Sequence, residues 1–173
     1  MAEIIFLDFE ASSLGDESWP IELGVCWLDN QEKLRTVSKL IKPHSDWKLS
    51  AWSEASQRVQ GIGLQELKTA EQATDVARWA LERLSSSLLL SDAPDFDLRW
   101  LNRLLATIDA CDALRIESIQ EHAAARFSGG ALGMFLKAYT SSRFTHRAAA
   151  DALRLGQAWR SALRKQRQRT KPR

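Results

Sequence analysis

Near its N-terminus the chain reads Glu-Ile-Ile-Phe-Leu-Asp-Phe-Glu over residues 3–10, an apolar run that ends in two acids. Its β-branched and aromatic residues predict a strand over residues 3–9. Side chains alternate between the faces of a strand, so Asp8 and Glu10 point to the same side, about 6–7 Å apart at ~3.3 Å per residue. Two acids on one face of an apolar strand are costly unless they are neutralised. A hard cation such as Mg²⁺ or Mn²⁺ would neutralise them, whereas the alternative is a strand that has simply reached solvent.

The segments that follow predict one α/β domain built around a mixed sheet. Residues 21–28 and 34–41 are apolar runs joined by a short polar turn, which indicates two antiparallel strands. Two further strands are expected at residues 87–90 and 114–119. Helices are expected at residues 75–84, after Pro94, at 132–139 and at about 147–164. Residues 43–74 are expected to form a loop with short helical turns.

Composition limits the class of protein. The 173 residues are 45% hydrophobic and 27% charged, which suits one domain with a real core. No apolar stretch approaches the ~20 residues needed to cross a bilayer, and no secretory signal is recognisable. Two cysteines, Cys26 and Cys111, cannot build a disulfide framework. We therefore expect a soluble cytoplasmic protein with reduced thiols and no membrane partner.

Charge is distributed unevenly along the chain. Residues 1–139 hold 14 Lys/Arg against 21 Asp/Glu, whereas residues 140–173 hold 10 Lys/Arg against the single acid Asp151. This pattern suggests a cation site near the acidic part and a polyanion near the basic part. The alternative is a solvated helix followed by a frayed basic end. We expect residues 1–164 to form the domain and residues 165–173 to form a flexible basic tail.

Two more groups of polar residues could join the acids of the first strand. Asp92, Asp95 and Asp97 surround the start of a predicted helix, where Asp95 suits the role of N-cap and leaves another role for Asp92 or Asp97. His146 and Asp151 are five residues apart, which is about 140° off a common helix face. They converge if His146 lies in the loop that leads into the helix.

Acids from distant segments, together with one histidine, form the set that a two-metal phosphodiester hydrolase needs. In such enzymes a histidine can take the proton from the attacking water at neutral pH.

Trp19, Trp47 and Trp52 lie in predicted loops and are candidates for stacking on bases.

Five short motifs follow one another in a recognisable order. Residues 8–14, Asp-Phe-Glu-Ala-Ser-Ser-Leu, are similar to Asp-x-Glu-x-Thr-Gly-Leu, and residues 21–24, Ile-Glu-Leu-Gly, to the signature of a second strand. Residues 59–62, Val-Gln-Gly-Ile, are similar to Val-His-Gly-Ile, and residues 96–101, Phe-Asp-Leu-Arg-Trp-Leu, to Phe-Asp-x-x-Phe-Leu. His146 and Asp151 have the spacing His-x-x-x-x-Asp. Over residues 3–160 the chain thus resembles the DEDDh 3′–5′ exonucleases, which include polymerase proofreading exonucleases, RNase T and oligoribonuclease.

This resemblance implies an RNase H-like fold, with a five-stranded mixed sheet flanked by helices. It also implies that two Mg²⁺ or Mn²⁺ ions are held by Asp8, Glu10, Asp97 and Asp151. His146 would be the general base, Leu14 an apolar wedge beside the terminal base, and Ala11 a backbone contact there. The implied substrate is DNA or RNA with a free, single-stranded 3′ end. The implied products are nucleoside 5′-monophosphates released from that end. Many members of this size are homodimers.

The chain departs from the family pattern at several positions. Ser12 and Ser13 replace Thr-Gly, and Gln60 replaces a histidine. Asp92-Ala93 stands where the family has His-Asn, so either Asp97 or Asp92 could be the ligand of the second motif, and we favour Asp97. The alternative function is a catalytically inactive nucleic-acid-binding module of the same fold.

Overall fold

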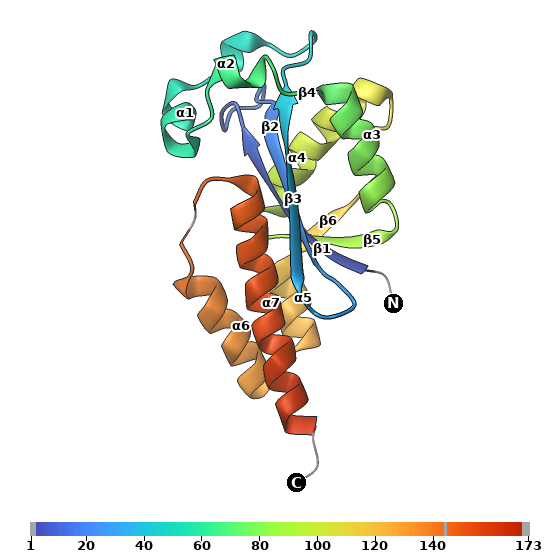
Figure 1. Ribbon diagram of the computed structural model, residues 1–173, viewed down its shortest axis with the longest axis vertical. Coiled ribbons are helices and arrows are strands. Elements are labelled where there is room, and N and C mark those ends of the chain that lie inside the picture. The colour runs from blue at the N-terminus through green and yellow to red at the C-terminus, as the bar shows by residue number, and fades with distance from the viewer. Residues whose placement is uncertain (1–2, 144, 171–173) are drawn as a thin grey trace.

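A mixed sheet forms the centre of the computed structural model, which describes residues 3–143 and 145–170 (Figure 1). Its strand order is β4-β3-β2-β1-β5-β6. The strands are β1 (Glu3–Ala11), β2 (Pro20–Leu28), β3 (Leu34–Lys42), β4 (Glu71–Gln72), β5 (Ser87–Ser91) and β6 (Ile116–Ser118). Strands β1, β2 and β3 pair antiparallel, whereas β5 pairs parallel with both β1 and β6. The predicted mixed sheet is confirmed.

The sheet has one strand more than the five predicted. The additional strand, β4, consists of two residues that pair with Ile41 and Lys42 at the end of β3. It falls in the region expected to be loop, and a pair of exposed residues carries no pattern from which a strand could be recognised. The other five strands lie where the sequence predicted them.

Helices cover both faces of the sheet. They are α1 (Glu54–Gln60), α2 (Leu64–Leu67), α3 (Ala73–Leu84), α4 (Pro94–Leu105), α5 (Ile119–Arg126), α6 (Gly129–Ser141) and α7 (Ala148–Thr170), with 3-10 turns at Leu49–Ala51 and Ala106–Ile108. Helices α3 and α4 lie on one face, and α5, α6 and α7 lie on the other (Figure 1). None of the helices described is both long and apolar enough to cross a bilayer.

The alternation of side chains along β1 divides the core into two layers. Ile5, Leu7 and Phe9 pack with α3 and α4, whereas Phe6 packs with α5, α6 and α7. Asp8 and Glu10 follow Phe6 at the same two-residue period, so they face the side that α7 covers. The strand thus directs two acids toward the helix that carries Asp151.

Helix α7 approaches the sheet closely because two glycines leave room for it. A Cβ atom on Gly24 of β2 would lie 2.1 Å from the carbonyl carbon of Ala148, the first residue of α7. A Cβ atom on Gly156 would lie 2.8 Å from Cys26 Sγ. This close packing fixes the start of α7 against the middle of the sheet.

Helix α7 also extends farther than predicted. It continues to Thr170, beyond the end expected at about residue 164, so residues 165–170 of the predicted tail are helical. Residues 171–173 lie outside the described part of the chain. The domain boundary at residue 164 stays a prediction.

Two of the tryptophans do not fit the role expected for them. Trp19 and Trp47 are buried, and their rings stack on one another with centroids 5.8 Å apart. Trp19 Nε1 also donates a hydrogen bond to the carbonyl of Lys48 at 3.1 Å. These two side chains pack the core and are not offered to bases, whereas Trp52 is partly exposed.

Candidate active site

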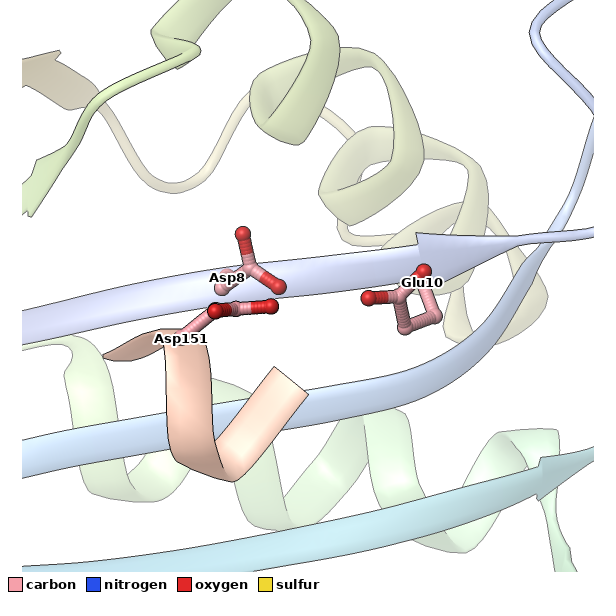
Figure 2. Close-up of side chains that lie close together, drawn as sticks. All are labelled: Asp8, Glu10 and Asp151. Carbon is pink, nitrogen blue, oxygen red and sulfur yellow. The ribbon is translucent and has the colours of Figure 1, made fainter. Parts of the chain in front are cut away.

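Three carboxylates that are far apart in sequence lie together at the junction of β1 and α7. Asp8 and Glu10 project from β1, and Asp151 projects from the first turn of α7 toward them (Figure 2). One oxygen of each carboxylate lies within 4.8 Å of an oxygen of each of the others. The structure therefore gathers three of the four predicted metal ligands into one group.

Asp151 is held by the loop that precedes its own helix. Its carboxylate accepts hydrogen bonds from the backbone N–H groups of Thr145 at 3.1 Å and His146 at 2.9 Å. His146 has a φ of 54°, a left-handed conformation that is uncommon outside glycine, and this turns the loop back onto α7. His146 lies in the loop and Asp151 in the helix, and both line the same cavity.

Glu22 fastens the start of α7 to the sheet. This buried side chain, 1% exposed, accepts a hydrogen bond from the N–H of Ala148 at 3.1 Å. It also accepts two from the guanidinium of Arg147, at 3.0 and 3.1 Å. Glu22 pairs in register with Glu10 on β1. In the sequence Glu22 is recognisable only as part of a motif. An acid inside an apolar strand nevertheless indicates a residue that needs buried hydrogen-bond partners.

Asp97 is adjacent to the three carboxylates but is not a member of their group. Its carboxylate, 1% exposed, accepts a hydrogen bond from the N–H of Phe9 at 3.2 Å and another from Ser91 Oγ. The pairing of β5 with β1 ends at Phe6, so Asp97 supplies an acceptor to β1 beyond that point. The rival residue, Asp92, forms an ion pair with Arg154 instead. Ligation by Asp97 stays a prediction.

Burial and mutual repulsion raise the pKa values of Asp8, Glu10 and Asp97. The pKa of Asp8 is raised well above its usual value by burial and then by repulsion from Asp97, Glu10 and Asp151. Burial, followed by repulsion from Asp151, raises the pKa of Glu10 to about 7. Burial also raises the pKa of Asp97 to about 8. Carboxylates crowded at this depth, with oxygen as the only donor atom, fit hard divalent cations.

The acids form one side of a cavity of about 410 Å³. Ala11 and Leu14, the predicted substrate contacts, line it, and the Leu14 side chain is 74% exposed. Val59 and Gln60 of α1 also line the cavity, and Gln60 Nε2 donates a hydrogen bond to the carbonyl of Ala11 at 3.1 Å. The cavity is thus lined by the three carboxylates and by His146, and the exposed Leu14 side chain gives it an apolar rim.

Several solved structures with the same architecture are exonucleases. Exonuclease I of E. coli, in a zinc-bound complex with single-stranded DNA, superimposes with a TM-score of 0.70 at 12% identity, over 96% of this chain and 41% of that one. Exonuclease I of Methylocaldum szegediense gives a TM-score of 0.71 at 14% identity, over 96% and 41%. A 3′-exonuclease that recognises the stem-loop of histone mRNA gives 0.67 at 14% identity, over 95% and 82%.

These likenesses confirm that the chain has the α/β fold of these enzymes, as the resemblance implied. The chain spans about two fifths of the length of exonuclease I and about four fifths of the histone mRNA 3′-exonuclease. No model of a protein family matches the chain, and the comparison with curated proteins gave no match. At this level of identity the comparison establishes the architecture.

Proposed function

We propose that the protein is a metal-dependent 3′–5′ exonuclease that releases nucleoside 5′-monophosphates from DNA or RNA. The observation that carries this proposal is the group formed by Asp8, Glu10 and Asp151, which lies beside His146 in one cavity. Structural neighbours bound to single-stranded DNA and to a stem-loop of mRNA support a nucleic-acid substrate.

The acidic group would hold two divalent cations, Mg²⁺ or Mn²⁺. Asp8, Glu10 and Asp151 supply ligand oxygens, and Asp97 joins them on the strength of its motif and its burial beside Asp8. Such ions, when bound, activate water and stabilise the leaving oxygen. Hydrogen bonds from Thr145 and His146 to Asp151 fix the direction in which its carboxylate points.

His146 is the proposed general base. It lines the cavity next to the acids, and its backbone N–H is bonded to Asp151, so the residue is held beside the proposed metal site. An imidazole takes a proton at neutral pH, which the reaction requires. His146 is not needed as a ligand in this scheme.

The exposed apolar rim is the proposed contact for the terminal nucleotide. Leu14 projects into solvent at the edge of the cavity and can lie against the last base, while the backbone of Ala11 contacts the same nucleotide. A leucine side chain packs against any base, so it grips a single-stranded end without reading its sequence.

Two matched oligonucleotides test the proposal. DNA and RNA strands of one sequence, labelled at the 5′ end, are incubated with protein and Mn²⁺ or Mg²⁺. We expect a ladder that shortens from the 3′ end and that is abolished by chelator and by Asp8→Asn. The control, Asp75→Asn, changes an exposed acid of α3 and should retain activity.

An inactive nucleic-acid-binding module is the second candidate, because Asp97 stands outside the group of three carboxylates. It is favoured if the oligonucleotides stay intact with either metal while still binding to the protein.

A homodimer in the cytoplasm is the proposed assembly and location. Sedimentation velocity at micromolar concentration checks the assembly, and a monomer there would contradict it.

A further inference from the structure

One buried cation of α7 lies next to the acidic group without a role in the scheme above. Arg154 is 5% exposed, and its guanidinium forms an ion pair with Asp92, whose side chain is 8% exposed. Its Nε lies 3.9 Å from Oδ1 of Asp151, one turn earlier on the same helix. Burying two charges is costly unless their geometry is favourable, so a pair at this depth calls for an explanation.

The ion pair connects two parts of the molecule that lie on opposite sides of the sheet. Asp92 belongs to the corner between β5, which ends at Ser91, and α4, which begins at Pro94. Asp97 lies in the first turn of α4 and is hydrogen-bonded to Ser91 Oγ. The pair therefore links the helix that carries Asp151 to the corner that carries Asp97.

An aromatic ring restricts the guanidinium further. Its central carbon lies 5.4 Å from the centroid of the Tyr139 ring on α6. The hydroxyl of Tyr139 accepts a hydrogen bond from Gln120 Nε2 at 2.7 Å, which fixes the ring to α5. Arg154 thus contacts Asp92 at the corner between β5 and α4, Asp151 on its own helix and Tyr139 on α6.

We propose that Arg154, together with Asp92, is a positioning residue that sets the separation of Asp151 and Asp97 for divalent cations. This inference rests on the proposed function. Arg154 has only donor groups and cannot itself be a ligand. Its charge, taken alone, would repel metal ions, but the carboxylate of Asp92 offsets that charge. In the intact pair the two charges offset each other, so the pair acts on metal binding through the positions of Asp151 and Asp97.

Calorimetric titration with Mn²⁺ tests this role without measuring turnover. We expect Arg154→Met and Asp92→Asn each to weaken Mn²⁺ binding about tenfold or more, the usual effect of removing a group that orients metal ligands. The double variant should lose no more than the weaker-binding single variant, because the two residues act as one unit. The matched control is Arg83→Met, since Arg83 also pairs with an acid, Glu3, at 2.7 Å and covers Trp27.

The outcomes separate the two proposals. If the wild-type protein binds no Mn²⁺, or binds it equally well after Asp8→Asn, the proposed function fails. If the wild type binds Mn²⁺ through Asp8 but both single variants bind it as tightly, or more tightly, the role of Arg154 alone is overturned. A lower unfolding temperature with unchanged Mn²⁺ affinity also overturns that role, because it indicates a purely structural one. If Arg154→Met does not fold, the double variant decides the question, because it removes the ion pair and leaves neither charge unpaired.

Discussion

At the scale of single residues, His146 and Asp151 share a hydrogen bond and a cavity but have different proposed roles. Asp151 is a proposed ligand of the cations, whereas His146, whose backbone N–H is bonded to Asp151, is the proposed base for the attacking water. Replacing the histidine side chain retains the backbone N–H that donates this bond. The two roles can therefore be separated experimentally.

His146→Ala should lower the rate of nucleotide release by about 10²–10⁴-fold, the usual contribution of a general base. Affinity for Mn²⁺ should stay close to that of the wild type, because no ligand is removed. Single-turnover kinetics and a Mn²⁺ titration on the same preparation check both statements. A loss of metal affinity as large as the loss of rate would contradict the role given to His146.

The crowded acids predict an unusual dependence of stability on pH. The folded state raises the pKa of Glu10 from 4.5 to about 7 and that of Asp97 from 3.8 to about 8. The native protein thus binds more protons than the unfolded chain between those limits, so its stability falls as pH rises through about 4–8.

Thermal unfolding in chelator, followed between pH 5 and 8, checks this dependence. Glu10→Gln should flatten the decline, because it removes one of the titrating groups. Mn²⁺ should reduce the decline in the wild type, since bound cations favour the ionised carboxylates. Stability in chelator that instead rises across this interval would show that these acids are not crowded in solution.

At the scale of elements, the contact between β2 and α7 determines where Asp151 lies. The N–H of Ala148 is bonded to Glu22, and the backbone of the same residue rests on Gly24, two residues farther along β2. A side chain at position 24 would have to push against backbone atoms of the helix, which cannot move aside as a flexible side chain could.

Gly24→Ala should therefore destabilise the protein by at least about 1–3 kcal/mol and weaken Mn²⁺ binding by moving Asp151 away from β1. The control is Gly133→Ala on α6, where no atom lies within 4 Å of the added methyl group. This control should stabilise the helix by up to about 1 kcal/mol. Urea unfolding compares the two, and equal stabilities would contradict the close packing of α7.

The elements that the sequence predicted well are those with a long apolar pattern. Strand β1 was recognisable because its apolar residues run without interruption up to Asp8. Helix α5 was missed because only Ile119 and Ala123 of its eight residues are buried, too few to show a helical period. The choice between Asp92 and Asp97 stayed open because it depends on partners such as Arg154 that are distant in sequence. Long-range contacts of this kind leave no local pattern to read.

At the scale of the whole molecule, α7 joins two regions of opposite charge. Its first turn carries Asp151, whereas its later part carries basic residues and runs away from the acidic group toward the C-terminus (Figure 1). At ~1.5 Å per residue, Arg164 lies about 20 Å along the helix from Asp151. A strand whose 3′ end occupies the cavity could extend along this helix and place its phosphates near the basic side chains. The exposed residues Arg164 and Lys165 are the simplest ones to test.

Arg164→Gln combined with Lys165→Gln should weaken the binding of a long single strand and make it less sensitive to salt. Removing one cation that pairs with a phosphate lowers the slope of log K against log salt by about 0.7, so we expect a change of about 1.4 for the pair. The control, Arg78→Gln combined with Arg115→Gln, removes the same charge from exposed positions outside α7 and should leave the slope nearly unchanged. Fluorescence anisotropy in chelator measures both, because it records binding without cleavage.

An oligonucleotide too short to reach from the cavity to Arg164 should bind both double variants alike. If the long strand shows the same slope with the α7 variant as with the wild type, the strand does not follow α7.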